Sequence, residues 1–432
     1  MGKNVCARGA LLLLTGVACV LSSVSAWAAE QTLSLPEVIE YALHYNGDLQ
    51  SFREEKGIVD AGKVKAGLLP NPTLDLEARS GALTGSSSES TLSVGISQEV
   101  LLAGKQSKRL AVAERERDLY RYQLAERERL VREEVKSLFY DVVLAEQRLA
   151  LADRSIALNR KLLEISKVRL AAGDIPELEM NLVKVELARS EASRVDGAKV
   201  LNQSQERLAT VIGLPVGTQY RVSGTLHSTT TPLRALSELK QQALAQRPDM
   251  KALEAERGGA EAAVRLARAE GVPNLTAGVV LWRDTRSLNI NGLEGTDKAW
   301  TVGMRLSMPL PVFDRNQAGV QEARALQSSA EIRWSTAIRN LEREVEMAYA
   351  SCLSSDKILS LYKADIIPQL EENLSLTEEA WRLGEVGILA VIQEQKKFFD
   401  VSDNYLMAHY NRQIALVKLD SAVATEVNGE IQ

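Results

Sequence analysis

The sequence predicts a mostly helical α+β protein built from two copies of one structural unit, each with a β-hairpin and a long helical hairpin. Three observations predict this fold: an internal repeat, two long stretches without Gly or Pro, and two pairs of segments that alternate apolar and polar residues. The composition agrees, because a chain of 432 residues with only 27 Gly and 5% aromatic residues favours long helices.

The internal repeat relates the first half of the chain to the second. The segment that begins at Leu35 matches the segment that begins at Leu236, at a constant shift of 201 positions. The shift grows to 211 between Gly173 and Gly384, which indicates insertions in loops. A repeat of this kind predicts that one structural unit occurs twice.

Each half contains two segments with the period-two alternation typical of strands: residues 73–78 and 92–97, then residues 275–282 and 300–307. We therefore expect one hairpin per half, and four strands cannot close a barrel alone. An open sheet in lipid leaves backbone groups unpaired at several kcal/mol each, so strands that cross a membrane need partners from other chains. A small soluble sheet packed on helices is the alternative.

Two stretches lack Gly and Pro, residues 105–172 and 320–367, and apolar residues recur in the first at spacings of three and four. An unbroken helix of the first span is about 100 Å long, which no compact globule needs. The second continues past Pro368, where we expect a kink. Each long helix ends at a glycine turn, at Gly173 and Gly384, and a second helix follows. The sequence thus predicts two helical hairpins.

Charge argues against a nucleic-acid partner. The formal net charge is -5, with 57 acidic and 52 basic residues, so the chain has no excess of basic residues that would attract nucleic acid. Within the first long helix, the charge runs at residues 114–117 and 126–129 are interpreted as solvated helix faces.

Residues 1–28 have the layout of a secretory signal peptide. Lys3 and Arg8 precede an apolar stretch, and small residues end at Ala28, where we expect cleavage. Lipidation at Cys19 is the less favoured alternative, because a lipoprotein signal usually has Leu where Gly16 stands.

The mature chain would keep Cys352 as its single cysteine, so no internal disulfide is expected. No later stretch reaches about 20 apolar residues, so we expect no membrane-spanning helix, and any membrane crossing must use strands. The chain has only three histidines, His44, His227 and His409, without a nearby Cys or paired-ligand spacing. It also lacks a phosphate loop and a nucleophile elbow. The sequence therefore predicts no enzyme activity, no cofactor and no resident metal.

Four features together resemble the TolC family of outer-membrane factors over nearly the whole mature chain. They are Arg247-Pro248-Asp249 at the second repeat, the strand-to-helix passage at residues 307–316, the Ile367-Pro368-Gln369 kink, and the two glycine turns. Within that passage, the sequence Pro-Leu-Pro-Val-Phe-Asp-Arg-Asn is most similar to the cobalt-zinc-cadmium resistance branch of the family. One departure is the passage at residues 98–105, which lacks the proline pair, so the two repeats are not interchangeable.

The resemblance implies a homotrimer in which twelve strands close one β-barrel in the outer membrane and twelve helices form an α-barrel in the periplasm of a Gram-negative bacterium. It implies a passive channel of a tripartite efflux system, with a periplasmic adaptor (membrane fusion protein) and an inner-membrane RND-type pump as partners. The implied cargo is heavy-metal cations. A multidrug or type I secretion exit duct remains an alternative, and a periplasmic helical-hairpin scaffold or adaptor without a pore is the alternative of a different class.

The sequence pattern and the resemblance together assign regions and residues. The expected domains are a signal peptide at 1–28, a first repeat at 29–213, an equatorial linker at 214–234 and a second repeat at 235–432. The glycine turns would form the periplasmic tip, where the residues expected to contact the adaptor are Leu170, Gly173, Asp174, Leu383, Gly384 and Val386. Asp174 and Glu385 are candidate pore-lining acids. The alternative explanation is helix capping, with Asp174 and Glu177 complementing the dipole of the returning helix.

Overall fold

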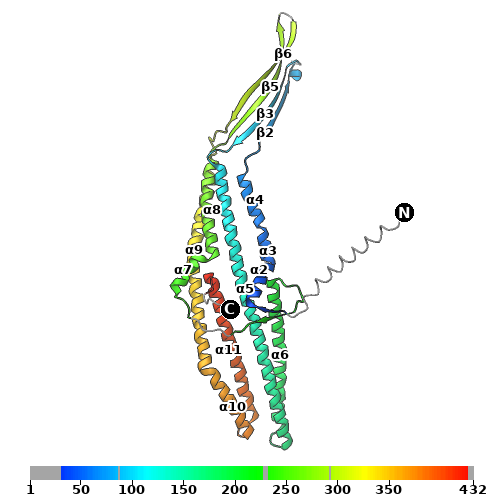
Figure 1. Cartoon of the computed structure of the whole chain (residues 1–432), viewed down its shortest axis with the longest axis vertical. Coiled ribbons are helices and arrows are strands. Elements are labelled where there is room, and N and C mark those ends of the chain that lie inside the picture. Colours follow the sequence, from blue (N-terminus) through cyan, green and yellow to red (C-terminus); the bar gives the residue numbers. More distant parts are fainter. Residues whose placement is uncertain (1–30, 86–87, 227–231, 291–292, 427–432) are drawn as a thin grey trace, which may run out of the picture. The chain divides into compact units, whose positions relative to one another are not determined.

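The computed structural model describes residues 31–85, 88–226, 232–290 and 293–426. The expected signal peptide at 1–28 lies outside the described residues. Figure 1 shows the helices and strands of the chain. The chain divides into two compact units. Unit 1 comprises Met1–Gln50, Arg127–Ala243 and Arg343–Gln432, and unit 2 comprises Ser51–Glu126 and Leu244–Glu342. Each unit contains parts of both predicted repeats, and the predicted domain boundaries stay a prediction.

The order of elements confirms that the chain repeats one structural unit. Helix α2 (Leu35–Tyr45) and helix α7 (Leu236–Gln246) begin and end at the predicted shift of 201 positions. Further helix, a strand pair and a long helical hairpin then follow in each half. Helix α4 (Lys56–Gly67) in the first half corresponds to α8 (Pro248–Glu270) in the second. The strand pair β2 (Thr73–Ser80) and β3 (Ser90–Val100) corresponds to the pair β5 (Leu275–Ile290) and β6 (Leu293–Ser307). The long helix α5 (Lys105–Ala172) corresponds to α9 (Gln317–Leu361) together with α10 (Ile367–Leu383), and the returning helix α6 (Glu177–Ile212) corresponds to α11 (Ile388–Val423).

The first long helix, α5, spans 68 residues with the predicted limits. The second is interrupted where the kink was expected, by the π-helical turn η3 (Tyr362–Ile366) between α9 and α10. Pro368 lies two residues beyond this turn. It has no N–H to donate, and its ring crowds the carbonyl four residues earlier, so the regular hydrogen-bond ladder cannot pass through this point.

The core of unit 1 lies where α2, α5 and α6 meet. Val135 and Phe139 of α5 and Leu208 and Ile212 of α6 are almost fully buried there. Polar contacts hold α11 to α5 along the same unit: the Arg148 guanidinium donates two hydrogen bonds to the Asp403 carboxylate, at 2.7 and 2.8 Å.

Unit 1 also contains a two-stranded parallel sheet that the sequence pattern did not predict. Strand β1 (Gln31–Ser34) pairs with β4 (Tyr220–Ser223), which lies inside the segment expected to be a linker without helix. Leu33, Tyr220 and Val222 are buried in the core of the unit. Four residues per strand are too few to show alternation, and a parallel partner lies far away in the sequence.

In unit 2, helix α8 packs on the first part of α9. Val264 and Ala267 of α8 form an apolar cluster with Ala323, and Arg333 donates a hydrogen bond to Glu256 at 2.5 Å. The described residues contain two further short helical segments, the η2 turn (Gly81–Thr84) and α3 (Gly47–Glu54). The boundary between the two units falls within α3.

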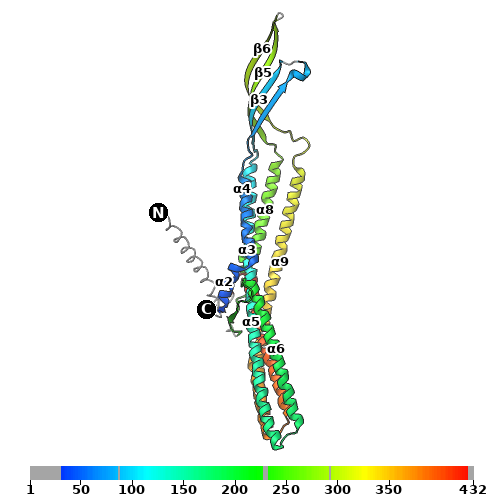
Figure 2. The ribbon, with the colours of Figure 1, turned by 90° about the vertical axis from the view of Figure 1, so that its right-hand side faces the viewer.

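The sheet of unit 2 is antiparallel with strand order β2-β3-β5-β6 (Figure 1). Figure 2 shows its strands β3, β5 and β6 after a turn of 90°. Strands β5 and β6 are longer than predicted, because their pairing continues through polar residues such as Asp284 with Ala299 and Arg286 with Asp297. Among the described residues, no helix is both long enough and apolar enough to cross a lipid bilayer.

Candidate functional site

The tips of the two helical hairpins share one local structure. Gly173 follows α5 with φ 81°, its N–H donates to the Leu170 carbonyl at 3.0 Å, and the Asp174 N–H donates to the Arg169 carbonyl at 2.9 Å. Gly384 follows α10 with φ 84° and makes the same contacts with Trp381, while Glu385 bonds back to Ala380 at 2.8 Å. A left-handed residue at this position lets the chain reverse, and only glycine adopts it without steric cost.

The two tips contact each other within unit 1. The Arg169 guanidinium donates a hydrogen bond to the Trp381 carbonyl at 2.8 Å and lies 5.3 Å from the centre of the Trp381 ring. Below this contact, side chains from all four hairpin helices form one small apolar core. Its buried members are Leu162, Val183, Trp381, Ile388 and Val391.

The structure places all six predicted adaptor-contact residues at these tips. Gly173, Asp174, Gly384 and Leu383 are exposed, the last with 67% of its surface accessible, while Leu170 and Val386 are half-buried. Val386 packs against the tip core. Glu385, the second candidate pore-lining acid, is also exposed. Within the part of the chain that the structure describes, neither Asp174 nor Glu385 forms an ion pair, so both carboxylates are available to cations.

A groove of about 790 Å³ runs along α5, α6 and α11 in unit 1, and sequence reasoning missed it. Small residues open it, including Ser193 and Gly197 of α6. Asn159 and Gln395 line it and are each 3% exposed, and their side-chain carbonyl oxygens have no hydrogen-bond partner among the described residues. One sequence signal was available, the spacing of the small residues Ser190, Ser193 and Gly197 on α6.

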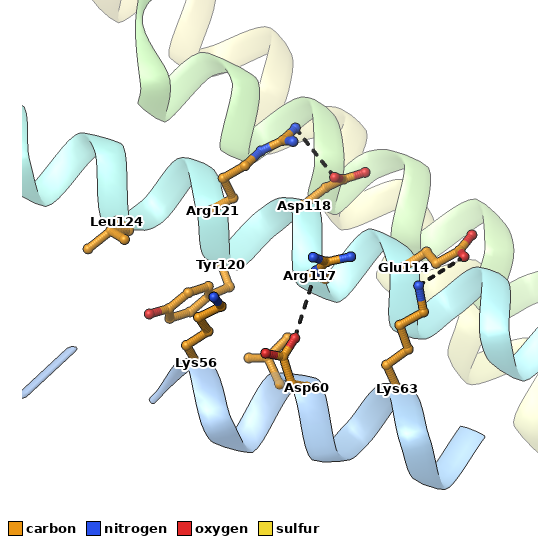
Figure 3. A pocket seen from close by; sticks show the side chains of 10 residues that line it. Lys56, Asp60, Lys63, Glu114, Arg117, Asp118, Tyr120, Arg121 and Leu124 are labelled. Atoms are coloured by element: carbon orange, nitrogen blue, oxygen red, sulfur yellow. Dashed lines mark ion pairs between the residues drawn. The ribbon is translucent and has the colours of Figure 1, made fainter. Parts of the chain in front are cut away.

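A second groove, of about 540 Å³, separates α4 from α5 in unit 2 (Figure 3). Charged side chains line it and pair across it: Arg117 lies 3.8 Å from Asp60, and Lys63 lies 3.4 Å from Glu114. The charge run at residues 114–117 is therefore partly engaged in helix contacts rather than wholly solvated. Exposed pairs of this kind stabilise by about 0–1 kcal/mol each.

The four-stranded sheet exposes an apolar face that crosses every strand. Cross-strand partners share a face, and two successive rows along this one consist entirely of aliphatic residues or Met. These rows are Leu74-Ile96-Val279-Met304 and Leu76-Val94-Leu281-Val302, and all eight side chains are at least 38% exposed.

The opposite face of the sheet is polar. There the Ser97 hydroxyl donates to Asp75 at 3.0 Å, and the Thr91 hydroxyl donates to Asp284 at 2.8 Å. Gly303 lies on this face beneath the Trp282 ring, where an added Cβ would approach the ring to 2.6 Å. The sheet thus has one apolar and one hydrogen-bonding side.

In the described ranges, no three His, Cys, Asp or Glu side chains gather closely enough to hold a metal ion. His44 and His409 lie on α2 and α11, whereas His227 lies outside the described residues. Cys352 is 1% exposed, and burial, reinforced by the negative charge of Asp356, raises the pKa of its thiol to about 12. Such a thiol is a packing residue rather than a nucleophile.

Two long segments, residues 46–214 and 239–425, match the family model described as outer membrane efflux protein. The chain belongs to the outer membrane efflux protein family. One matched segment falls in each half of the chain, in agreement with the repeat, and the match confirms the resemblance to TolC-type outer-membrane factors. As a member of this family, the protein is located in the outer membrane.

The relatives of this efflux family protein include proteins named for cation resistance and cation efflux. The cobalt-zinc-cadmium resistance protein CzcC of Cupriavidus metallidurans is 25% identical over 374 residues, which are 87% of this chain and 86% of CzcC. The cation efflux system protein CusC of Escherichia coli is 25% identical over 296 residues, which are 67% of this chain and 63% of CusC.

Solved structures with the same fold cover nearly the whole chain. A crystal structure of CusC has a TM-score of 0.74 at 19% identity and covers 92% of this chain and 95% of that one. The open state of the MtrE outer membrane channel of Neisseria gonorrhoeae has a TM-score of 0.72 at 19% identity, with 92% and 90% covered. These likenesses confirm the predicted mostly helical α+β fold.

Proposed function

We propose that this protein is the passive outer-membrane channel of a tripartite efflux system and that it exports heavy-metal cations. The observation that carries this proposal is the two-faced sheet of unit 2, apolar and exposed on one side and hydrogen-bonded on the other. Strands that alternate apolar and polar residues in this way are the pattern of a transmembrane barrel with a wet interior.

The sheet is incomplete in one chain. Strands β2 and β6 are its two edges, and each leaves a row of backbone groups without a ladder partner in the sheet. Such edges are unstable in lipid, where unpaired groups cost several kcal/mol each. Three copies joined edge to edge would close a twelve-stranded barrel, which supports the homotrimer that the family resemblance implies.

The paired hairpin tips would receive the periplasmic adaptor, which joins the channel to an inner-membrane RND-type pump. Exposed Leu383 offers an apolar contact, and the small Gly173 and Gly384 permit close approach of another backbone. An added Cβ at Gly173 would meet nothing within 4 Å, and one at Gly384 would meet only the Arg169 guanidinium, at 3.8 Å.

The cargo assignment rests on relatives whose names refer to cobalt, zinc, cadmium and other cations. The acids at the tips, Asp174 and Glu385, would attract cations without holding them, because a conduit must release what it passes. On this account the protein catalyses no reaction and needs no cofactor.

Two substitutions on strand β6 test the membrane assignment. Met304→Arg places a charge on the apolar face and should cost about 2–4 kcal/mol at the bilayer midplane. Thr301→Arg places the same charge on the polar face and is the matched control. We expect Met304→Arg to be lost from the outer-membrane fraction as a heat-modifiable trimer while Thr301→Arg remains. Equal recovery of both variants would contradict the proposal and favour a periplasmic scaffold.

The cargo is tested by deleting the gene and measuring growth on cobalt, zinc and cadmium salts beside a panel of hydrophobic drugs. Sensitivity to the metals alone, restored by the native gene, is the expected result. Sensitivity to drugs alone would assign the channel to multidrug export instead.

A further inference from the structure

A short apolar segment between β6 and α9 is exposed in unit 2. Residues 308–313 read Met-Pro-Leu-Pro-Val-Phe and contain no charged or hydrogen-bonding side chain. Leu310 is 76% exposed, Val312 64% and Phe313 91%. Transfer of these exposed apolar side chains from water to an apolar environment would be favourable.

Part of the backbone of this segment is satisfied within the chain. Pro309 and Pro311 have no N–H to satisfy, and the Val312 N–H donates to the Leu310 carbonyl at 2.9 Å. Side chains that follow the segment cap its carbonyls: Arg315 Nε donates to the Pro311 oxygen at 3.1 Å, and Gln317 Nε2 donates to the Phe313 oxygen at 3.0 Å. Water would satisfy these groups equally well, but hydrocarbon would not, so internal pairing matters most in lipid.

The apolar band on the strand itself is too short for a bilayer. On β6 the exposed apolar side chains run from Trp300 to Leu306, and Lys298 marks the polar limit on the same face. The six residue steps from Trp300 to Leu306 span about 20 Å along a strand at ~3.4 Å each. At a tilt of ~40° this gives about 16 Å of the ~25 Å that an apolar barrel band occupies. Residues 308–313 could supply the missing height, and Asp314 would mark the other limit.

The corresponding passage of the first half lacks this feature. Leu101 and Leu102 are half-buried, and Lys105 is 3% exposed. The Lys105 ammonium donates to the Asn274 side chain at 2.7 Å, which ties this passage to the interior of unit 2. An exposed apolar passage therefore occurs once per chain in the described structure.

We propose that residues 308–313 insert into the periplasmic leaflet of the outer membrane as a lipid-contacting anchor; this rests on the proposed function. The occupant of this surface is lipid rather than a second copy of the chain. Met308, Leu310 and Val312 are exposed, and along the chain they follow directly on the exposed apolar residues of β6, which end at Leu306. The Arg315 side chain would reach the headgroup level while bonded to the segment.

Spin labels test this proposal in the full chain reconstituted in phospholipid vesicles. Labels are attached at Leu310→Cys and Phe313→Cys in a background in which Cys6, Cys19 and Cys352 are replaced by Ala, and their accessibility to oxygen and to a water-soluble nickel chelate is measured. Labels that face lipid are accessible to oxygen but hardly to the chelate. Labels that face water are accessible to both reagents, and more so to the chelate. Labels buried against protein are accessible to neither. Val302→Cys on the sheet face is the lipid control, and Leu178→Cys, 69% exposed in the first turn of α6, is the aqueous control.

We expect the oxygen-to-chelate accessibility ratio at positions 310 and 313 to be severalfold higher than at 178 and similar to that at 302. Chelate accessibility equal to position 178 would overturn the proposal, and so would low accessibility to both reagents, which would indicate contact with a second copy. A water-like result at position 302 would instead contradict the proposed function itself. Far-ultraviolet circular dichroism and trimer mobility verify that each variant is folded.

Discussion

The guanidinium of Arg169, at the end of α5, donates a hydrogen bond of 2.8 Å to the backbone carbonyl of Trp381, near the end of α10, and lies over its ring. The charged hydrogen bond stabilises by about 1.5–3 kcal/mol, and the cation–π contact adds about 0.5–1 kcal/mol. We predict that Arg169→Ala loosens the two tips. Limited proteolysis at the glycine turns should become severalfold faster.

Arg382 provides the matched control for this prediction. It lies one residue from Trp381 and is exposed, and among the described residues its ion pair is with Glu379 on the same helix, at 2.5 Å. Arg382→Ala should leave proteolysis at the turns unchanged. If Arg169→Ala and Arg382→Ala were cleaved at the same rate as the native chain, the contact would not hold the tips together.

Gly213 ends α6 at a point where no side chain fits. Its φ is 75°, and an added Cβ would lie 2.4 Å from the Tyr45 carbonyl oxygen. Gly213→Ala should therefore destabilise unit 1 by about 2–4 kcal/mol, through left-handed strain together with displacement of α2. Gly217 has φ 85° with nothing within 4 Å. Gly217→Ala should cost only about 1 kcal/mol, and thermal unfolding followed by circular dichroism should separate the two variants.

The acids at the tips should control block of the channel by cations. Replacing Asp174 and Glu385 with Ala removes two exposed carboxylates per chain and should weaken block of single-channel current by polyvalent cations severalfold. Glu40→Ala, an exposed acid on α2, should leave the block unchanged. Equal block in all three proteins would exclude these carboxylates from the conduction path.

The thiol of Cys352 should be inert in the folded protein. Because burial raises its pKa to about 12, almost no thiolate exists at pH 8, and maleimide should react only after unfolding. The raised pKa also determines how folding stability depends on pH. The stabilising contribution of the neutral thiol is complete below its ordinary pKa of 9.0 and is lost as the pH rises towards 12. Rapid labelling of the native protein would contradict the buried placement.

The sequence predicted features that depend on local periodicity. The limits of α5 followed from an uninterrupted helical pattern between Gly104 and Gly173, both of which have positive φ. The apolar face of the sheet followed from alternation in β2 and β3. Local pattern is sufficient in these places because each residue's neighbours along the chain are also its neighbours in the element.

Features that depend on distant partners were missed. The Arg169–Trp381 contact joins residues 212 positions apart, and nothing in either local sequence indicates it. The pairing of β1 with β4 and the polar extension of β5 and β6 have the same cause, since backbone pairing there does not require an apolar pattern. At the tips the sequence identified the glycines and acids but not the arginine and tryptophan that bring the two turns together.

The current through a planar lipid bilayer after addition of the purified native chain tests the central claim most directly. If three chains close one barrel around a water-filled duct, the current should rise in discrete steps of uniform size. A bilayer that shows no steps, at protein concentrations where a known outer-membrane channel inserts readily, would contradict the account of this protein as an exit duct.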